Sequence, residues 1–524
     1  MRRQREGTAT DPPDDRGQSS VAEGGEQYGQ ILKSSVLIGG SSALNVGLGI
    51  VRSKALALLL GPAGFGLMGL YLSISNLAQS IAGMGVNSSG VRQIAAAVGS
   101  GDTARVARTA AVLRRTSVAL GALGAVLLLV LSGPISRLSF GTSERTLPVA
   151  LLSLAVLFRV VSDGQAALVQ GLRRISDLAR IAVYGGLAAT LATIGLVYLL
   201  GERGVVPSLI ATAAASLIFS WWFGHKAGVP TAPLAASEVS LEARALLKLG
   251  FAFMASAMLT MGAAYAVRLL IVRMVNIEAA GLYQSGWTLG GLYVGFILQA
   301  MGADFYPRLT AVVQERAQCN RLVNEQAQIS LLLAGPGVIA TLTFAPLVLG
   351  IFYSRAFGGA AAMLRWISMG AALQVVSWPI GFVILAEGRQ NLFFWTELAF
   401  TVVHVGLAWV LVATLGVNGA GVAFFLAYVF HAFMIYAVVR NLTGFAWSGS
   451  NRQLGFFFLG LIGLVFCAFW ALAPWAATGV GVVALLASGV HSVRTLVRLV
   501  SPTRLPRPLQ WLLPLAGIRL RGKG

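Results

Sequence analysis

Four basic side chains interrupt long apolar runs of the sequence. Arg52 and Lys54 lie in "GIVRSKALALLL" (49–60), Arg159 in "LFRVV" and Arg268 in "AVRLL". A charged side chain at the centre of a bilayer costs about 2.5–3.5 kcal/mol on insertion scales, so these residues are not expected to face lipid. In a wet interior they can bind an anion through charge-assisted hydrogen bonds. All four are therefore candidate binding groups for a negatively charged substrate.

These cations also have structural explanations. A Lys or Arg near a helix end can reach the headgroups along its own aliphatic stem. For Arg52 and Lys54 this snorkelling and substrate contact remain equally open. Arg159 has Asp163 four residues later, and an i,i+4 ion pair between them would neutralise its charge.

Few acidic side chains share membrane depth with the cations, so the interior is predicted to be net positive. This charge suits a diphosphate and does not suit a cationic drug. Glu397 and His404 are seven residues apart, which places them nearly on one helix face, and histidine titrates near neutral pH. Asp163, Glu397 and His404 are therefore candidates for ion or proton coupling, with a structural hydrogen-bonded pair as the alternative for the last two.

The composition is that of a polytopic, all-α membrane protein. The chain has 524 residues, of which 56% are hydrophobic and 11% charged, and its mean hydropathy is +0.76. A spanning helix needs about 20 apolar residues. Stretches of this kind are found at 31–60, 66–91, 110–132, 148–172, 179–200, 204–223, 246–275, 279–303, 327–352, 359–386, 391–414, 417–439, 453–473 and 477–497.

These stretches give 14 spans, an even number, so both termini are expected on one side of the membrane. Of the 39 basic residues, 29 fall in the tails and loops of that side, which predicts that it is cytoplasmic. The opposite loops carry four, namely Arg137, Arg145, Arg203 and Arg355. The remaining six are the four candidate residues together with Arg273 and Arg365, for which snorkelling is favoured. The net charge of +20 therefore follows from topology and does not indicate nucleic-acid binding.

The ends of the chain and its cysteines indicate no further chemistry. Residues 1–28 lack an apolar core, carry charges of both signs and are predicted to form a disordered cytoplasmic tail, and 501–524 a basic cytoplasmic tail. Cys319 and Cys467 are too few for a disulfide framework, and no cluster has metal-ligand spacing. We therefore expect no metal and no cofactor. The glycines of "GGSSALNVGLG" at 39–49 are a candidate hinge in the first span.

The sequence repeats itself at one constant offset of 215 residues. "VVS" at 160–162 matches "VVS" at 375–377, and the same shift matches Gly201 and Gly204 with Gly416 and Gly419, and Gly66-Leu67 with Gly281-Leu282. Six spans per repeat mean that both halves enter the membrane in the same direction. We expect an N-terminal six-helix bundle at 29–240, a second at 241–445 and two additional spans at 446–500. Two such bundles facing each other are typical of alternating-access transporters.

The stretch "LLLGPAGFGL" between the first two spans, together with "ILAEGRQN" at 384–391 and "LGVNGAGVAF" at 415–424, resembles bacterial O-antigen translocases. These flippases for lipid-linked oligosaccharides belong to the multidrug/oligosaccharidyl-lipid/polysaccharide exporter superfamily. The resemblance implies outward transport of an undecaprenyl-diphosphate oligosaccharide across the bacterial inner membrane. It also implies contact with membrane lipids and, as candidate partners, other membrane proteins of polysaccharide assembly. We expect a monomer.

Three alternatives remain beside this function. A lipid II-type flippase also has fourteen spans, and a multidrug antiporter of the same superfamily is disfavoured by the positive interior. A membrane enzyme of the same pathway would need acid, base or metal-binding carboxylates in an extramembrane loop. The longest outer loop, 133–147, offers only Glu144 as an acid, so the chain is predicted not to be an enzyme. Membrane potential alone or coupled protons or ions could supply the energy.

Overall fold

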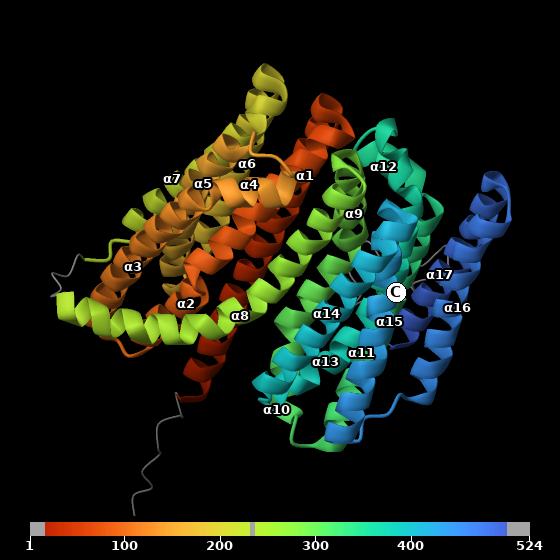
Figure 1. Ribbon diagram of the computed structural model, residues 1–524. Coiled ribbons are helices and arrows are strands. Elements are labelled where there is room, and N and C mark those ends of the chain that lie inside the picture. Colours follow the sequence, from red (N-terminus) through yellow and green to blue (C-terminus); the bar gives the residue numbers. More distant parts are fainter. Residues whose placement is uncertain (1–15, 231–235, 500–524) are drawn as a thin grey trace, which may run out of the picture.

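The computed structural model describes residues 16–230 and 236–499, and the regular structure within these ranges is entirely helical (Figure 1). The first half contains α1 (Arg16–Gly83), α2 (Val86–Gly99), α3 (Thr103–Val130), α4 (Ser132–Phe140), α5 (Thr146–Gly171), α6 (Ile175–Leu200) and α7 (Val205–Lys226). The rest contains α8 (Ala236–Met274), α9 (Ile277–Ala300), α10 (Tyr306–Val312), α11 (Arg316–Thr343), α12 (Ala345–Phe352), α13 (Ala361–Ala386), α14 (Gln390–Leu415), α15 (Val417–Thr443), α16 (Gly449–Ala471) and α17 (Pro474–Leu499). The predicted all-α, polytopic fold class is confirmed.

Eleven helical segments among the described residues are long and apolar enough to cross a membrane. Two of these segments hold two helices each. Gly40–Gly83 is kinked at Gly61, where φ is 63°, and Pro62 opens the second arm of α1; Ile175–Lys226 contains α6, a short 3₁₀ turn at Gly201–Gly204 and α7. Each of the fourteen predicted spans overlaps one arm of α1 or one of α3, α5–α9, α11 and α13–α17, but α9 is not among the eleven segments, so the number of spans stays a prediction. The break in α1 lies at Gly61 rather than within the predicted hinge at 39–49.

The helix boundaries repeat at the offset found in the sequence. That shift carries both ends of α5 onto the ends of α13, and both ends of α6 onto the ends of α14. Gly201 and Gly416, which end α6 and α14, have φ/ψ values of 58°/−133° and 60°/−142°. We call residues 40–226 the N-half and 236–443 the C-half. The predicted domain boundaries at 29, 240, 445 and 500 stay predictions, as does disorder in 1–28, where α1 is described from Arg16.

The two additional helices pack on the C-half. α16 and α17 contact α11 and lie at the outer edge of the molecule (Figure 1). Arg365 of α13 helps to hold them there, because its guanidinium lies 3.8 Å from the centre of the Phe469 ring on α16 and its Nε donates to the carbonyl of Leu342 (3.1 Å). Arg365 therefore has partners within the protein, and the snorkelling favoured from the sequence stays a prediction.

The two halves meet where the second arm of α1 crosses α9. Gly66 packs against the backbone of Ile277 and Gly281, and Gly281 packs against the backbone of Pro62 and Gly66. The offset of the repeat relates Pro62 to Ile277 and Gly66 to Gly281. The two segments that touch here are therefore equivalent segments of the two halves. Their contact marks the axis that relates the two halves.

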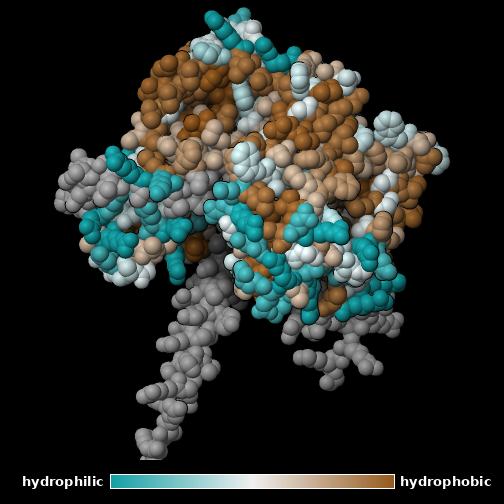
Figure 2. All heavy atoms as spheres, turned by 60° about the horizontal axis from the view of Figure 1, so that its bottom comes forward, coloured by the Kyte–Doolittle hydropathy of each residue, from teal (hydrophilic) through white to brown (hydrophobic). Residues whose placement is uncertain are grey.

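The crossing lies toward one end of the bundle. We call the end that carries Gly61 the kink side, and the opposite end, with the turns at 171–175 and 386–390, the tail side. Figure 2 brings the tail side forward and shows hydrophilic residues gathered on it, with hydrophobic residues over the flanks beyond.

Arg145 on the kink side has a raised pKa. Burial lowers the pKa of its guanidinium, but the hydrogen bonds with Tyr71 and Glu202 outweigh the effect of burial.

A methyl group at the crossing should separate the halves. We expect Gly66→Ala and Gly281→Ala to lower the stability of the protein by about 1–3 kcal/mol, the usual cost of overpacking a close contact. Gly291→Ala is the matched control on α9, since nothing lies within 4 Å of its added methyl group. Thermal unfolding of the purified protein in detergent measures the difference. Equal melting temperatures for Gly281→Ala and Gly291→Ala would contradict the close crossing.

Candidate functional site

A cavity of about 440 Å³ with many polar lining residues lies between helices of the N-half and α8 of the C-half. Its walls come from the second arm of α1, the start of α2, and the middle of α3 and α5, while α8 of the C-half covers it. The polar lining residues are Asn76, Gln79, Ser80, Asn87, Ser88, Ser117, Arg159 and Asp163. Met254, Ala257 and Met261 of α8 line the remaining wall. The cavity therefore combines a cation, a carboxylate and three amides with a wall from the other half.

Asp163 is held by an amide rather than by its neighbouring cation. Gln79 Nε2 donates to Asp163 Oδ2 over 2.6 Å. Arg159 lies one turn before Asp163 on α5, and its charge acts on that carboxylate, but the two form no ion pair within 4 Å. The i,i+4 pair considered from the sequence is therefore not formed, and Arg159 makes no hydrogen bond with any residue that the structure describes.

Arg52 is the second unpaired cation of this region. It is half-buried on the first arm of α1, and within the described ranges it has neither a hydrogen bond nor an ion pair. The charge that acts on it is that of Arg159, which repels it. The charge of Arg159 thus acts both on Arg52 and on the Asp163 carboxylate, which already accepts a hydrogen bond from Gln79.

Lys54 and Arg268 are satisfied by the protein itself. Lys54 Nζ donates to the carbonyl of Gly350 in α12 (2.8 Å), and this bond joins the two halves on the kink side. Arg268 Nε and Nη2 donate to Gln284 Oε1 (2.9 and 2.6 Å), and Nη1 donates to the carbonyl of Ala264 (3.2 Å). Arg52 and Arg268, which are near-counterparts in the repeat, therefore differ: Arg268 is bonded and Arg52 is not.

Glu397 and His404 are not joined in the structure. His404 is buried at 5% exposure, stacks on Phe400 at 5.8 Å, and its Nε2 has no hydrogen-bond partner among the described residues. Glu397 lies near the hydroxyl of Tyr428. His431 Nδ1 is 3.1 Å from Ser377 Oγ. A proton path from Glu397 to His404 thus lacks a hydrogen bond between its two members, whereas Asp163 lies on the cavity.

The sequence contained a signal for the amides that was not used. Asn76, Gln79, Ser80 and Gly83 recur at helical spacing in "SNLAQSIAGMG" within an apolar run, which places them on one face. Their meeting with α5 could not be read from the sequence, because Gln79 and Asp163 are 84 residues apart. In the described part of the chain no group of three or more His, Cys, Asp or Glu could hold a metal ion.

The fold has known relatives among membrane transporters. A structure of the lipid II flippase MurJ in an inward closed conformation aligns with a TM-score of 0.66 at 12% identity and covers 89% of this chain and 100% of that one. An inward-facing multidrug resistance MATE family transporter of the MOP superfamily aligns with a TM-score of 0.62 at 17% identity, covering 78% and 95%. The chain thus shares the polytopic helical fold of these two proteins.

A family model described as polysaccharide biosynthesis protein matches residues 55–362, and the chain belongs to this family. The "Lipid III flippase" of Escherichia coli (strain K12) is 22% identical over 408 residues, which are 76% of this chain and 95% of that protein. The family resemblance predicted from the sequence is confirmed. These relatives are flippases and transporters and none of them is an enzyme, in line with the prediction from the sequence.

Because Arg268 is hydrogen-bonded and Arg52 is not, we expect Gln284→Leu and Arg52→Leu to affect the stability of the protein differently. Gln284→Leu leaves the Arg268 guanidinium without its main acceptor, and an unsatisfied buried charged group costs about 1–3 kcal/mol or more. Arg52→Leu removes a repulsion with Arg159 and should leave stability unchanged or raise it. Thermal unfolding in detergent compares the two variants.

The double variant Arg268→Leu/Gln284→Leu is the control for lost packing. It should be more stable than Gln284→Leu alone, since no unpaired charge remains. A Gln284→Leu protein as stable as the parent would show that Arg268 is not held by this bond.

Proposed function

We propose that the chain is a flippase that moves an undecaprenyl-diphosphate-linked oligosaccharide, an O-antigen or related repeat unit, from the cytoplasmic to the periplasmic leaflet by alternating access. The observation that carries the proposal is the pair of unpaired cations, Arg52 and Arg159, beside a polar cavity. A diphosphate supplies the oxygens that these guanidinium groups lack, in the bidentate geometry that arginine favours. The names of the lipid III and lipid II flippases among the relatives support a lipid-linked substrate.

Membership in this superfamily leaves a multidrug antiporter as the other transporter function. A cationic drug would meet two repelling guanidinium groups and one carboxylate that Gln79 already engages. The charges in and beside the cavity thus favour an anionic substrate. A lipid II-type substrate has the same diphosphate, so the glycan decides between it and an O-antigen unit.

The structure corresponds, in this proposal, to an inward-facing state. The halves are linked on the kink side, where Lys54 donates to Gly350 and Ser139 Oγ lies 2.7 Å from the hydroxyl of Tyr265. If the kink side is periplasmic, these contacts close the outer end of the transport path. Alternating access then requires that they break while contacts form on the tail side in addition to the one already present, where Gly85 packs against the backbone of Gly250 on α8.

Replacing Arg52 tests the function directly. Arg52→Ala should lower delivery of the glycan to the outer face of cells lacking their own flippase by about tenfold or more, the effect of losing a hydrogen bond to a charged group. Arg52→Lys should keep part of the delivery, since a point charge still attracts phosphate. Membrane abundance is measured in parallel, and Arg115→Ala, an exposed arginine of α3, is the matched control.

Arg159→Ala and the double variant extend the same assay. Normal delivery by Arg52→Ala and Arg159→Ala, singly and together, would exclude this pair as the diphosphate site. We also propose Asp163 as the coupling group, because it is the carboxylate on the cavity. Outward movement of negative charge gains about 2.3 kcal/mol per charge per 100 mV, so unchanged delivery by Asp163→Asn would mean that the membrane potential suffices without it.

The orientation of the chain can be tested with single cysteines. In a background with Cys319 and Cys467 replaced by serine, Glu144→Cys lies in an exposed kink-side loop and Thr103→Cys at the exposed tail-side start of α3. A membrane-impermeant maleimide added to spheroplasts with an intact inner membrane should label Glu144→Cys, and Thr103→Cys only after that membrane is permeabilised. The reverse pattern would overturn the predicted cytoplasmic location of the termini.

A further inference from the structure

The turns that join α5 to α6 and α13 to α14 are equivalent in the repeat and share their backbone. The amide of Arg174 donates to the carbonyl of Val169 over 3.1 Å, and the amide of Arg389 donates to that of Ile384 over the same distance. The φ/ψ values of Arg174 and Arg389 are −80°/65° and −84°/61°. The two arginine side chains therefore leave the backbone in the same direction, on the tail side of each half.

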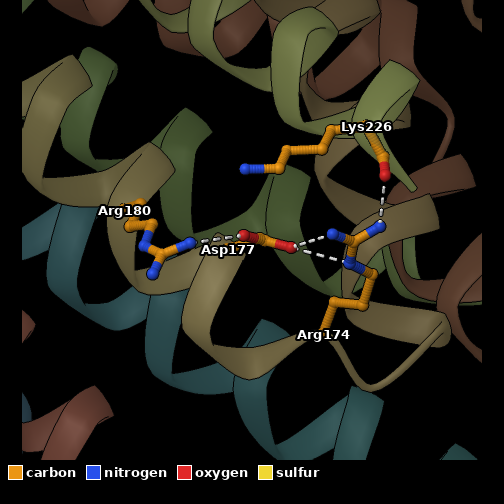
Figure 3. A network of polar contacts seen from close by, with 4 residues as sticks. All are labelled: Arg174, Asp177, Arg180 and Lys226. Carbon is orange, nitrogen blue, oxygen red and sulfur yellow. Dashed lines mark hydrogen bonds and ion pairs between the residues drawn. The ribbon is translucent and has the colours of Figure 1, made fainter.

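In the N-half, a carboxylate of the protein pairs with this arginine (Figure 3). Arg174 donates from Nε and Nη2 to Asp177 Oδ2 at 2.6 Å each, and from Nη1 to the carbonyl of Lys226 at 2.8 Å. Arg180 Nη1 adds a bond to Asp177 Oδ1 at 3.2 Å. Asp177 is 5% exposed. The turn thus holds one buried anion between two guanidinium groups.

The C-half turn keeps the arginine and lacks the anion. Leu392 and Trp395 stand at the positions that correspond, in the repeat, to Asp177 and Arg180. The Arg389 side chain is exposed and makes no hydrogen bond or ion pair with any described residue. Glu387, two residues earlier, instead has its charge near Cys319 of α11.

The space around Arg389 is open. A pocket of about 470 Å³ is lined by Gly388, Arg389, Gln390, Asn391 and Leu392. The side-chain amides of Gln390 and Asn391 add hydrogen-bond donors next to the guanidinium. Gly388, Arg389, Gln390 and Asn391 belong to the stretch "ILAEGRQN" at 384–391, which has no role in the proposed transport site.

We propose that the Arg389 turn binds the phosphate of a lipid headgroup at the tail-side surface, in the place that the Asp177 carboxylate takes in the N-half. The planar guanidinium fork fits two phosphate oxygens as it fits a carboxylate. Two sources carry this group. One is the diphosphate of the transported lipid, which would be captured here before entering the path and rests on the proposed function; the other is an anionic phospholipid such as phosphatidylglycerol.

Binding is measured on the purified full-length chain in detergent, by titration of undecaprenyl diphosphate and, separately, dioleoylphosphatidylglycerol with native mass spectrometry. Arg389→Ala should weaken binding of the true occupant about tenfold, as expected for one hydrogen bond to a charged group. Arg452→Ala is the matched control, because Arg452 is an exposed arginine at the tail-side start of α16 outside the pocket.

A second variant tests the comparison of the two turns. Leu392→Asp gives Arg389 the carboxylate partner that Arg174 has, so it should lower phosphate affinity to the level of Arg389→Ala. Leu392→Asn has nearly the same size without the charge and should retain most of the affinity. Melting temperatures of both variants are measured first, since Leu392 packs against the hydrophobic core, and Arg389→Lys with partial affinity remains the test if Leu392→Asp does not fold.

The two lipids separate the sources. If Arg389→Ala loses affinity for undecaprenyl diphosphate alone, the result supports capture of the transported lipid. If it loses affinity for the phospholipid, the result supports a headgroup site. Unchanged binding of both lipids by Arg389→Ala overturns the proposal. Because binding is measured without transport, this result would leave the Arg52 delivery assay, and with it the proposed function, unaffected.

Discussion

A guanidinium or ammonium group inside a bilayer has no water to accept its hydrogen bonds, so the protein must supply the acceptors. Four of the six cations in or at the ends of the predicted spans meet this demand with neutral groups, among them Arg273, which donates to the carbonyl of Arg137. Lys54 uses the carbonyl of Gly350, Arg268 uses Gln284 and a carbonyl, and Arg365 uses a carbonyl and the Phe469 ring. Arg52 and Arg159 have no such acceptors within the described structure, and they repel each other. These two unsatisfied positions are the ones at which we propose that an anionic ligand binds.

The repeat keeps the same backbone geometry in both halves and distributes polar groups unequally. Arg159 and Asp163 of the cavity correspond to Gln374 and Trp378, which in the C-half are hydrogen-bond partners of the Tyr428 hydroxyl. Because the helices that carry these pairs correspond residue for residue, the difference lies in the side chains. One half therefore holds a space lined by charged and polar side chains, and the other fills the equivalent place with an amide and aromatic rings.

The sequence predicts the features that depend on local composition and on the repeat. The length of each apolar stretch predicts a helix, because a membrane span must satisfy its backbone hydrogen bonds internally. The constant offset of the repeat predicts the two halves. Side-chain partners depend on contacts between distant segments and were not predictable in this way. Asp163 pairs with Gln79, 84 residues away, in preference to Arg159 one turn before it, and Lys54 reaches Gly350, 296 residues away.

The type of contact between the halves bears on how they could move. At the crossing of α1 and α9, Gly66 and Gly281 present backbone to backbone, and Phe65 beside them packs edge to face against Tyr353 and Phe357 of the C-half. The polar links near it are single hydrogen bonds, each worth about 0.5–1.5 kcal/mol net, or up to about 3 kcal/mol where one partner is charged. Such links can be exchanged for water or for a ligand without unfolding a helix. Rotation of one half against the other about this crossing must also repack the apolar core that both halves share, which includes Leu56 and Phe65 of the N-half and Val267 and Tyr283 of the C-half.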